Sequence, residues 1–328
     1  MRRNNNSKRI LLVGSTSFIG KNLTRRLISS GHKVYSLDRS RINNQLPKEN
    51  IFLYDISRPK TIIKAFKKIK NIDICINFAG GAGASLSSRS TFELNYFGVK
   101  YLYSACRMYG VKRFVQLSSA SVYGKVSKNK VINEDSPTYP YNNYSMAKLL
   151  ADDYLINNQN EETKVTILRL PQVYGRNTSV TIPGLVEKIR NSKFILFGKG
   201  SNIIHPLHVD NLVDLFIRII DDNNAKKDGL FVLADNKYFN LKFFLETIIS
   251  RFKSKKSYRT FPIFLLYILY AFSNFIYLIL GRTLIKKENL LFYSSSRIID
   301  SSKAREKLSY EPVYDCKDKL GEAIDSFI

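Results

Sequence analysis

Tyr144 and Lys148 carry a phenol and an ammonium group within five residues of sequence. Residues four apart lie on one face of a helix, so a helix here would set the two side chains together. A phenol held as its anion can accept the proton of a substrate hydroxyl. The pair alone is a weak signal, because the chain has 20 tyrosines and 52 lysines and arginines. An exposed tyrosine beside a solvated lysine is the alternative.

Tyr144 needs a lowered pKa to act as a base near neutral pH. An ordinary tyrosine has a pKa of about 10, so a drop of about 3 units, or about 4 kcal/mol, is required. One ammonium group about 4 Å away, at an effective dielectric constant of about 20, supplies roughly that much. We therefore expect Lys148, if it points inward, to lower the pKa of Tyr144 to about 7.

Ser119 lies 25 residues before Tyr144 and follows the apolar run at residues 113–117. Such a run is typical of a buried strand. A serine at the end of that strand can hydrogen-bond the reacting oxygen and stabilise charge that develops on it. We expect Ser119 to share the site with Tyr144 and Lys148.

Short apolar runs alternate with helical patterns through the first half of the chain. The six expected strands comprise residues 10–13, 33–37, 51–54, 72–78, 113–117 and 165–168. Strands that alternate with helices form βαβ units and a parallel sheet. We therefore predict an α/β fold with a doubly wound parallel sheet, whose ligand crevice lies at the carboxyl ends of the strands.

Gly14 and Gly20 bracket the turn between the first expected strand and the first helix. Such glycines permit a tight turn and close packing, and backbone N–H groups at the helix start can receive a pyrophosphate. Asp38 follows 18 residues after Gly20, where an acid can bind a ribose hydroxyl. This favours NAD over NADP, although Arg39 weakens the preference. Asp38 as a simple turn residue is the alternative.

These features together resemble the extended short-chain dehydrogenases/reductases, the NAD-dependent epimerase/dehydratase family. The resemblance covers nearly the whole chain. The segments that carry it are residues 14–20, Asp55 with Ile56, residues 77–80, Asn95, residues 118–124, residues 168–175 and residues 208–211.

The resemblance implies a Rossmann fold and assigns roles to individual residues. It implies catalysis by Ser119, Tyr144 and Lys148, with a positive nicotinamide ring assisting Lys148. The cofactor-binding residues that it implies are Gly14, Ser17, Phe18, Ile19, Gly20, Asp38, Asp55, Ile56, Phe78, Ala79, Gly80, Asn95, Tyr144, Lys148 and Pro171. No metal site is expected, because His205 and His208 lack further ligands nearby in the sequence.

The resemblance also divides the chain. A dinucleotide-binding domain is expected at residues 1–175, with residues 203–235 returning to it. A smaller C-terminal α/β substrate lobe is expected from residues 176–202 and 236–328. A homodimer through the helices that carry Tyr144 and Asn95 is implied as well.

Three departures from the family pattern bear on the substrate. Ser17 replaces a glycine of the loop and could crowd a pyrophosphate. Ile204 stands where nucleotide-sugar epimerases usually carry an arginine that holds the substrate diphosphate, so a soluble nucleotide sugar is less certain. Ala120 and Ser121 stand beside Ser119 where dehydratases carry an acid pair. The reaction is therefore expected to be epimerisation or simple dehydrogenation.

Residues 261–280 form a strongly apolar stretch with basic residues on both sides. The stretch is consistent with a buried helix of the substrate lobe, with a helix in the membrane interface, or with a membrane span. The net charge of +25 comes with no recognised nucleic-acid motif, so no nucleic-acid partner is expected. Three scattered cysteines favour a cytoplasmic protein, with the inner face of the membrane as one location.

The leading hypothesis is an NAD-dependent 4-epimerase that passes through a transient keto sugar. The sugar would be nucleotide- or polyprenyl-linked. One alternative is an NAD(P)-dependent dehydrogenase or reductase of a membrane-associated alcohol, similar to 3-beta-hydroxysteroid dehydrogenases. The other is a non-catalytic dinucleotide-binding scaffold, which the presence of both Tyr144 and Lys148 disfavours.

Overall fold

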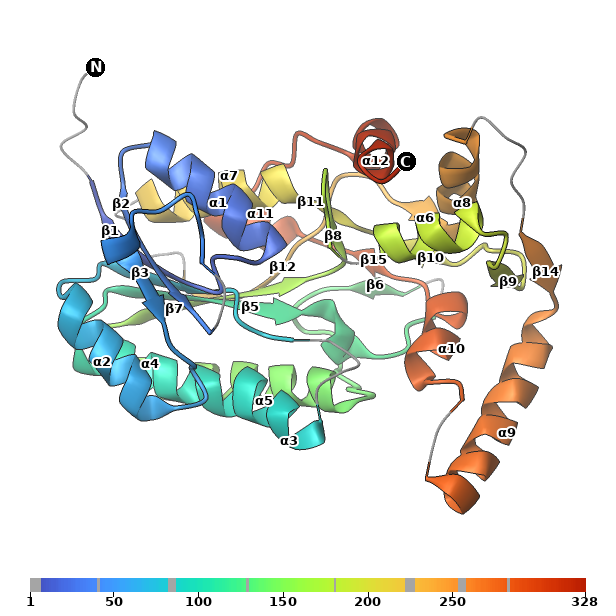
Figure 1. Cartoon of the computed structure of the whole chain (residues 1–328), viewed down its shortest axis with the longest axis horizontal. Coiled ribbons are helices and arrows are strands. Elements are labelled where there is room, and N and C mark those ends of the chain that lie inside the picture. The colour runs from blue at the N-terminus through green and yellow to red at the C-terminus, as the bar shows by residue number, and fades with distance from the viewer. Residues whose placement is uncertain are drawn as a thin grey trace.

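A seven-stranded parallel sheet forms the centre of the computed structural model (Figure 1). The structure describes residues 7–39, 42–81, 87–127, 130–179, 181–221, 228–252, 258–281 and 284–328. The strand order is β12-β7-β5-β4-β1-β2-β3. The strands are β1 (Arg9–Val13), β2 (Lys33–Asp38), β3 (Ile51–Leu53), β4 (Ile74–Asn77), β5 (Arg113–Ser119), β7 (Lys164–Leu170) and β12 (Gly229–Val232).

The sheet confirms the predicted fold class and all six predicted strands. β12 is an addition that short-range pattern did not predict; it pairs in parallel with β7 at one edge. Chain order reverses between β1 and β4, which are neighbours in the sheet. A crevice therefore opens at the carboxyl ends of these two strands, where ligands bind in open α/β sheets.

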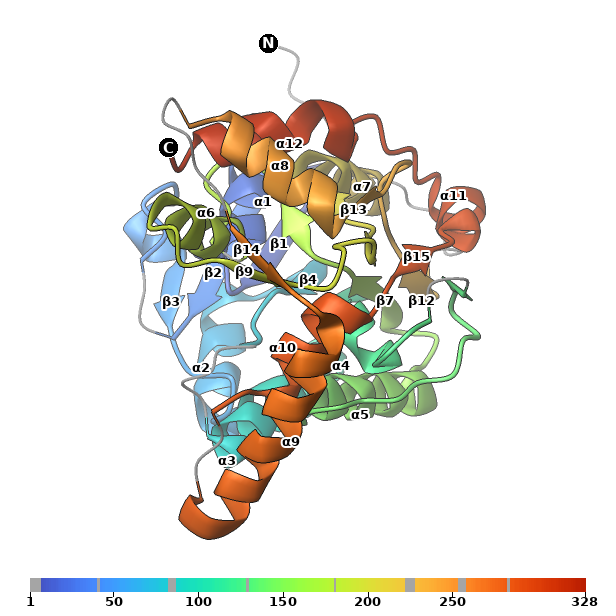
Figure 2. The same ribbon diagram turned by 90° about the vertical axis from the view of Figure 1, so that its right-hand side faces the viewer.

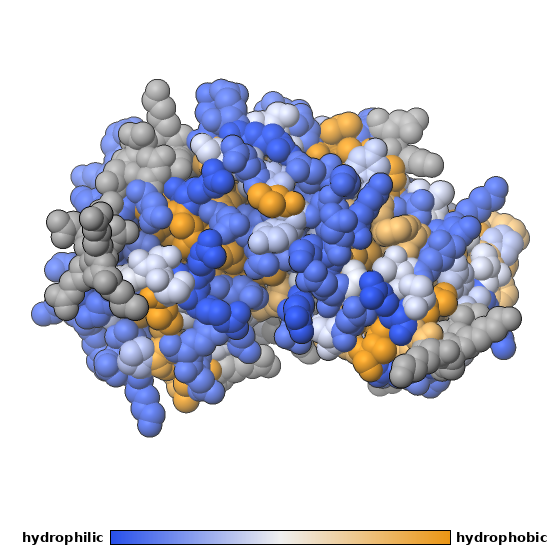
Figure 3. Space-filling model, turned by 90° about the horizontal axis from the view of Figure 1, so that it is seen from above, coloured by the Kyte–Doolittle hydropathy of each residue, from blue (hydrophilic) through white to orange (hydrophobic). Residues whose placement is uncertain are grey.

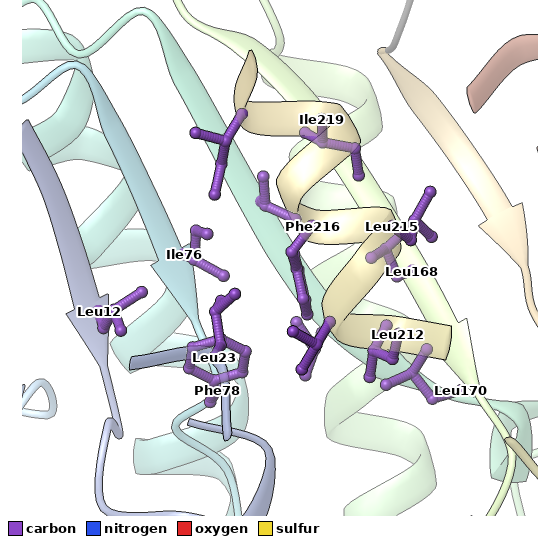
Figure 4. Close-up of a cluster of buried hydrophobic side chains, with 14 of the residues drawn as sticks. Leu12, Leu23, Ile76, Phe78, Leu168, Leu170, Leu212, Leu215, Phe216 and Ile219 are labelled. Carbon is purple, nitrogen blue, oxygen red and sulfur yellow. The ribbon is translucent and has the colours of Figure 1, made fainter. Parts of the chain in front are cut away.

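Helices cover both faces of the sheet (Figure 1). One face carries α1 (Phe18–Ser29), α7 (Val209–Asp221) and α11 (Ser302–Leu308), and the other carries α2 (Pro59–Ile69), α4 (Gly98–Met108) and α5 (Asn143–Asn158). In the first layer, Leu212 and Phe216 of α7 pack onto Ile76 and Leu168 of the sheet (Figure 4). Because both faces of the sheet are covered, its strands are apolar almost throughout, as the sequence pattern indicated.

Short elements connect these layers. The chain runs from β4 through α3 (Ser88–Phe92) and the π-helical turn η2 (Glu93–Phe97) directly into α4. Two 3-10 turns, η1 (Lys48–Asn50) and η3 (Ala120–Tyr123), precede β3 and follow β5.

A separate apolar cluster lies beside the sheet, among α6 (Ile182–Arg190), α8 (Leu241–Ser250) and α12 (Cys316–Asp325). Four two-stranded sheets join distant parts of the chain around it. They pair β10 (Ile203–Ile204) with β13 (Phe239–Asn240), β11 (Leu207–His208) with β8 (Val173–Tyr174), β14 (Arg259–Phe261) with β9 (Ile195–Phe197), and β15 (Ile298–Ile299) with β6 (Val131–Ile132). The domain boundaries and the homodimer stay predictions.

The apolar stretch forms α9 (Ile263–Leu280), which projects from the body and is followed by α10 (Lys287–Ser294) (Figures 1 and 2). Among the described side chains of α9, only Leu266 and Ser273 are buried. The expectation of a buried lobe helix is therefore wrong, because no part of the described chain covers most of α9. Within the described residues, no helix meets the length and hydropathy needed to cross a membrane.

Candidate active site

The glycine loop between β1 and α1 leaves no room for side chains at its two ends. Gly14 has φ +83°, and a Cβ built on it would lie 2.9 Å from the backbone N of Ala79. A Cβ on Gly20 would lie 2.7 Å from the carbonyl oxygens of both Gly14 and Ser15. Gly14 therefore allows the loop to pack against the end of β4, and Gly20 allows α1 to begin in contact with the backbone of the loop.

Ser17 caps the helix that follows this loop. Its Oγ accepts a hydrogen bond from the Gly20 N–H at 3.1 Å. The hydroxyl thereby satisfies one of the free N–H groups of the first helical turn. Replacing the family's glycine with serine is thus compatible with the turn, but it leaves one N–H fewer for a bound anion.

Asp38 ties the loop to the end of β2. Its carboxylate accepts hydrogen bonds from the Ser15 hydroxyl at 2.7 Å and from the Thr16 hydroxyl at 2.8 Å. The Thr16 N–H donates to the same carboxylate at 3.2 Å. Asp38 is 5% exposed and lies at the edge of the cavity described next. Asp38 therefore does more than form a turn, since it holds the loop as well as presenting a negative charge.

A cavity of about 370 Å³ lies over the carboxyl ends of β1, β2 and β4. The predicted cofactor residues that line it are Gly14, Ser17, Asp38, Asp55, Ile56, Phe78, Ala79 and Gly80. The lining residues absent from the prediction are Val13, Thr16, Leu37, Arg39, Tyr54 and Leu94. Phe18 and Ile19 instead pack against the core cluster. Two glycines with no room for a Cβ, a helix N-terminus, a carboxylate and apolar walls are the features that a dinucleotide requires, so the residues present fit one.

The predicted catalytic residues come together next to this cavity. The side chains of Ser119 and Tyr144 are hydrogen-bonded. Lys148 Nζ donates to the Leu117 carbonyl oxygen at 2.9 Å and lies 5.9 Å from the centre of the Tyr144 ring. A Cβ on Gly80 would lie 2.8 Å from both Lys148 Nζ and Asn95 Oδ1. Gly80 therefore allows the cofactor cavity and the catalytic side chains to adjoin.

The prediction that Lys148 lowers the pKa of Tyr144 is wrong for the protein groups alone. Burial raises the pKa of Tyr144 to about 12, and the hydrogen bond from Ser119 only partly opposes this. Burial also lowers the pKa of Lys148 to about 8, opposed by the negative charge of Asp152. Removing Tyr144 and Lys148 from water disfavours the charged form of each, and this cost exceeds the attraction that a dielectric constant of about 20 implies.

A buried ion pair beneath Lys148 was not predicted. Asp152 Oδ2 accepts hydrogen bonds from Arg169 Nε at 2.9 Å and from the Ser118 hydroxyl at 2.8 Å. Arg169 Nη1 in turn donates to the Tyr123 hydroxyl at 3.1 Å. The spacing could have identified Asp152, since it follows Lys148 by four residues on the same helix. The pair places a negative charge below Lys148 and favours its charged form.

A second cavity of about 210 Å³ lies on the substrate side, between the end of β7 and α10. Predicted residue Pro171 lines this cavity rather than the first one. Ile204 and His205 line it too, and His205 is held in place by the Ile299 N–H at 3.0 Å and the Asp235 carbonyl at 2.8 Å. The role of this histidine is therefore structural. The cofactor contacts assigned from the resemblance stay predictions.

Comparisons with known proteins agree on one family. The model of the NAD dependent epimerase/dehydratase family matches residues 10–234. Sterol-4-alpha-carboxylate 3-dehydrogenase, decarboxylating, of Homo sapiens is 26% identical over 215 residues, which are 64% of this chain and 56% of the human protein. The chain therefore matches little more than half the length of that relative.

A second relative is N-acetyl-alpha-D-glucosaminyl-diphospho-ditrans,octacis-undecaprenol 4-epimerase of Escherichia coli O157:H7. It is 25% identical over 71% of this chain and 69% of its own length. Among solved structures, Bordetella bronchiseptica WbmG in complex with NAD has a TM-score of 0.79 at 16% identity, covering 100% of this chain and 96% of that one. UDP-glucose 4-epimerase of Thermotoga maritima has a TM-score of 0.76 at 21% identity, covering 97% and 98%.

Gly20→Ala is expected to destabilise the protein and weaken dinucleotide binding, because the new methyl group would displace the loop. We expect the free energy of unfolding to fall by about 1–3 kcal/mol. Gly184→Ala in α6 is the matched control, since a Cβ there meets open space. It should raise stability by up to about 1 kcal/mol. Urea denaturation measures both, and equal effects of the two changes would contradict the steric account.

Lys148→Met is expected to change how stability depends on pH. The folded protein releases the Lys148 proton near pH 8, below the ordinary pKa of 10.5, so the unfolded state binds more protons between these values. The free energy of unfolding of the wild type should therefore rise with pH across this window relative to the variant. Urea midpoints measured from pH 7 upward test this, and a difference that stays constant or falls would contradict the burial of Lys148.

Proposed function

The chain belongs to the NAD-dependent epimerase/dehydratase family, and we propose that it is a 4-epimerase that oxidises and re-reduces one carbinol carbon of an activated sugar. The observation that carries the proposal is the meeting of Ser119, Tyr144 and Lys148 beside the glycine-loop cavity. A hydroxyl base, a hydrogen-bond donor and a cation beside a dinucleotide cavity are the groups that this chemistry needs.

Each residue of the cleft has its own role in the proposed reaction. NAD, held by the glycine loop, Asp38 and Asp55, would supply a hydride acceptor. Tyr144 takes the proton of the sugar hydroxyl, and Ser119 hydrogen-bonds the same oxygen as its charge develops. Lys148 favours the phenolate form of Tyr144 by its charge. Tyr144 would return the proton to the same oxygen when the carbinol is re-formed on the other face, so the whole reaction has no net redox change.

The residues after Ser119 favour epimerisation over dehydration. Ala120 and Ser121 continue into η3, and neither can act as a second acid or base. Dehydration needs such a pair to remove a proton from carbon and to protonate the leaving hydroxyl.

Tyr144→Phe is expected to lower kcat by about 10²- to 10⁴-fold, the usual contribution of a positioned acid–base group, with little change in KM. The assay is chromatographic detection of the epimer formed from N-acetylglucosaminyl diphosphate carried on uridine or on a short polyprenol. Tyr139→Phe is the matched control, because that tyrosine precedes the same helix and is 64% exposed. Full activity in Tyr144→Phe would contradict the assignment.

We propose further that the sugar is carried by a membrane lipid and that α9 docks on the bilayer surface. Phe264, Phe272, Phe275 and Leu278 are each more than half exposed, and the spacing of 100° per residue places them on one face of the helix. A helix that lies in the membrane interface buries such an apolar face at the boundary between head groups and acyl chains. At 18 residues α9 is about 27 Å long. By contrast, the face that carries α1, α7 and α12 is mostly hydrophilic (Figure 3).

Charge and shape around α9 agree with an anionic bilayer. Arg259, Lys286 and Lys287 are exposed near its two ends, and the helix contains no acidic residue. Basic residues at a membrane surface are attracted to anionic lipids by about 1 kcal/mol each. A cavity of about 700 Å³ at the base of α9 is lined by Pro262 and Ile263, and it shares Asn202 with the substrate-side cavity. The two cavities therefore adjoin at Asn202, between the base of α9 and the substrate side of the cleft.

The double variant Phe275→Asn, Leu278→Asn is expected to lose binding to phosphatidylglycerol-containing vesicles. Two exposed apolar side chains contribute about 3 kcal/mol when lipid buries them, so the partition should fall roughly 100-fold. Met108→Asn, Val313→Asn is the matched control, since these residues are 70% and 78% exposed elsewhere. Co-sedimentation at low and high salt measures the effect. Wild-type protein that never pellets would contradict bilayer docking.

A dehydrogenase of a membrane-associated alcohol is the second candidate. The relatives favour it as well, since they include sterol-4-alpha-carboxylate 3-dehydrogenase and the 3-beta-hydroxysteroid dehydrogenase of Mycolicibacterium neoaurum. The two candidates differ in net redox change. Accumulation of reduced cofactor in step with product favours the dehydrogenase, whereas product formed without it favours the epimerase.

A further inference from the structure

Arg297 lies next to Ile204, the position at which the family resemblance predicts an arginine. Its backbone N–H donates to the Ile203 carbonyl oxygen at 3.0 Å, which sets Arg297 beside Ile204. Ile204 is the position where the resemblance led us to expect an arginine. The positive charge is therefore absent from β10 but present on the adjoining segment, just before β15.

The guanidinium of Arg297 is poorly compensated. Nη2 donates to the Gly124 carbonyl oxygen at 3.3 Å, and the side chain hydrogen-bonds Tyr141. Its Nε is buried and has no hydrogen-bond partner. Across the described ranges, no carboxylate forms an ion pair with it. The nearby Glu288 is engaged by the Asn142 side chain at 2.6 Å. Arg297 is half-buried, and a cation partly removed from water without a counter-charge is costly, which indicates a function for the charge.

The surroundings of Arg297 form a small polar chamber next to the catalytic residues. Arg297 and Tyr141 line the substrate-side cavity of about 210 Å³, together with Gln172, Asn202 and the carboxylate of Glu288, which accepts the hydrogen bond from Asn142. Tyr141 lies three residues before Tyr144 and is close enough to raise its pKa. The chamber has room for a phosphate or carboxylate group.

We propose that Arg297 and Tyr141 form an oxyanion-binding subsite that receives a phosphate or carboxylate group of the substrate next to its reacting carbon. The inference rests on the proposed function, since it names the substrate chemistry of the same cleft. A guanidinium binds both anions through paired N–H groups, and the Tyr141 hydroxyl adds a third donor. The subsite separates substrates that carry an anion from neutral alcohols.

The test is binding of small probes to the purified full chain by calorimetry. Inorganic pyrophosphate and UDP represent a phosphate source, glucuronate a carboxylate source, and methyl glucoside a neutral sugar. Wild-type protein should bind at least one anionic class and bind methyl glucoside more weakly. Arg297→Met should weaken the bound anion roughly 10- to 100-fold, and Arg297→Lys should recover part of the loss. Arg107→Met, an exposed arginine on α4, should change nothing.

Thermal denaturation separates a binding role from a structural one. Removing a half-buried cation that has no ion pair should leave Tm of Arg297→Met unchanged or raised, while anion affinity falls. A lowered Tm with unchanged affinity in both variants would overturn the subsite, as would equal binding of methyl glucoside and the anions. The two proposals fail separately: full activity of Tyr144→Phe together with Arg297-dependent anion binding would overturn the epimerase and leave the subsite standing.

Discussion

The hydrogen bond from Lys148 to the Leu117 carbonyl organises the whole cleft. It holds a buried ammonium group at the carboxyl end of β5, against the place where Gly80 has no side chain. Asp152 below supplies the countercharge that favours the protonated form of Lys148, and Asp152 is itself paired with Arg169. The cleft thus depends on the charge of Lys148, which burial destabilises and the negative charge of Asp152 stabilises.

Burial also explains why the pKa of Tyr144 is too high for a base near neutral pH when only the protein groups act on it. Burial acts against the charged forms of both Tyr144 and Lys148, so the cleft in the absence of ligands favours a neutral phenol. A positively charged nicotinamide is the further cation that the family resemblance implies. Base strength would then be coupled to cofactor binding, and the free protein would be protected from unproductive proton transfer.

Local pattern predicted the sheet well, because each buried strand is a short apolar run and each ligand residue follows one. It predicted Ser119, Tyr144 and Lys148 from strand-end position and helical spacing. It could not predict that α9 is exposed, since apolar composition is the same for a buried helix and a lipid-facing one. Arg297 also escaped prediction, because its proximity to Ile204 arises from tertiary pairing between segments 93 residues apart. The prediction of a low pKa for Tyr144 was wrong because the sequence does not show how deeply the phenol is buried.

The substrate side combines an apolar helix exposed to solvent with a half-buried cation that lines a small cavity. Both support the proposal of an anionic sugar carried at a bilayer. The most direct measurement is mass spectrometry of the nucleotide released from denatured, purified wild-type protein. The account predicts NAD, retained through purification as a recycled cofactor. A protein that releases no nucleotide and takes up neither NAD nor NADP on addition would contradict it.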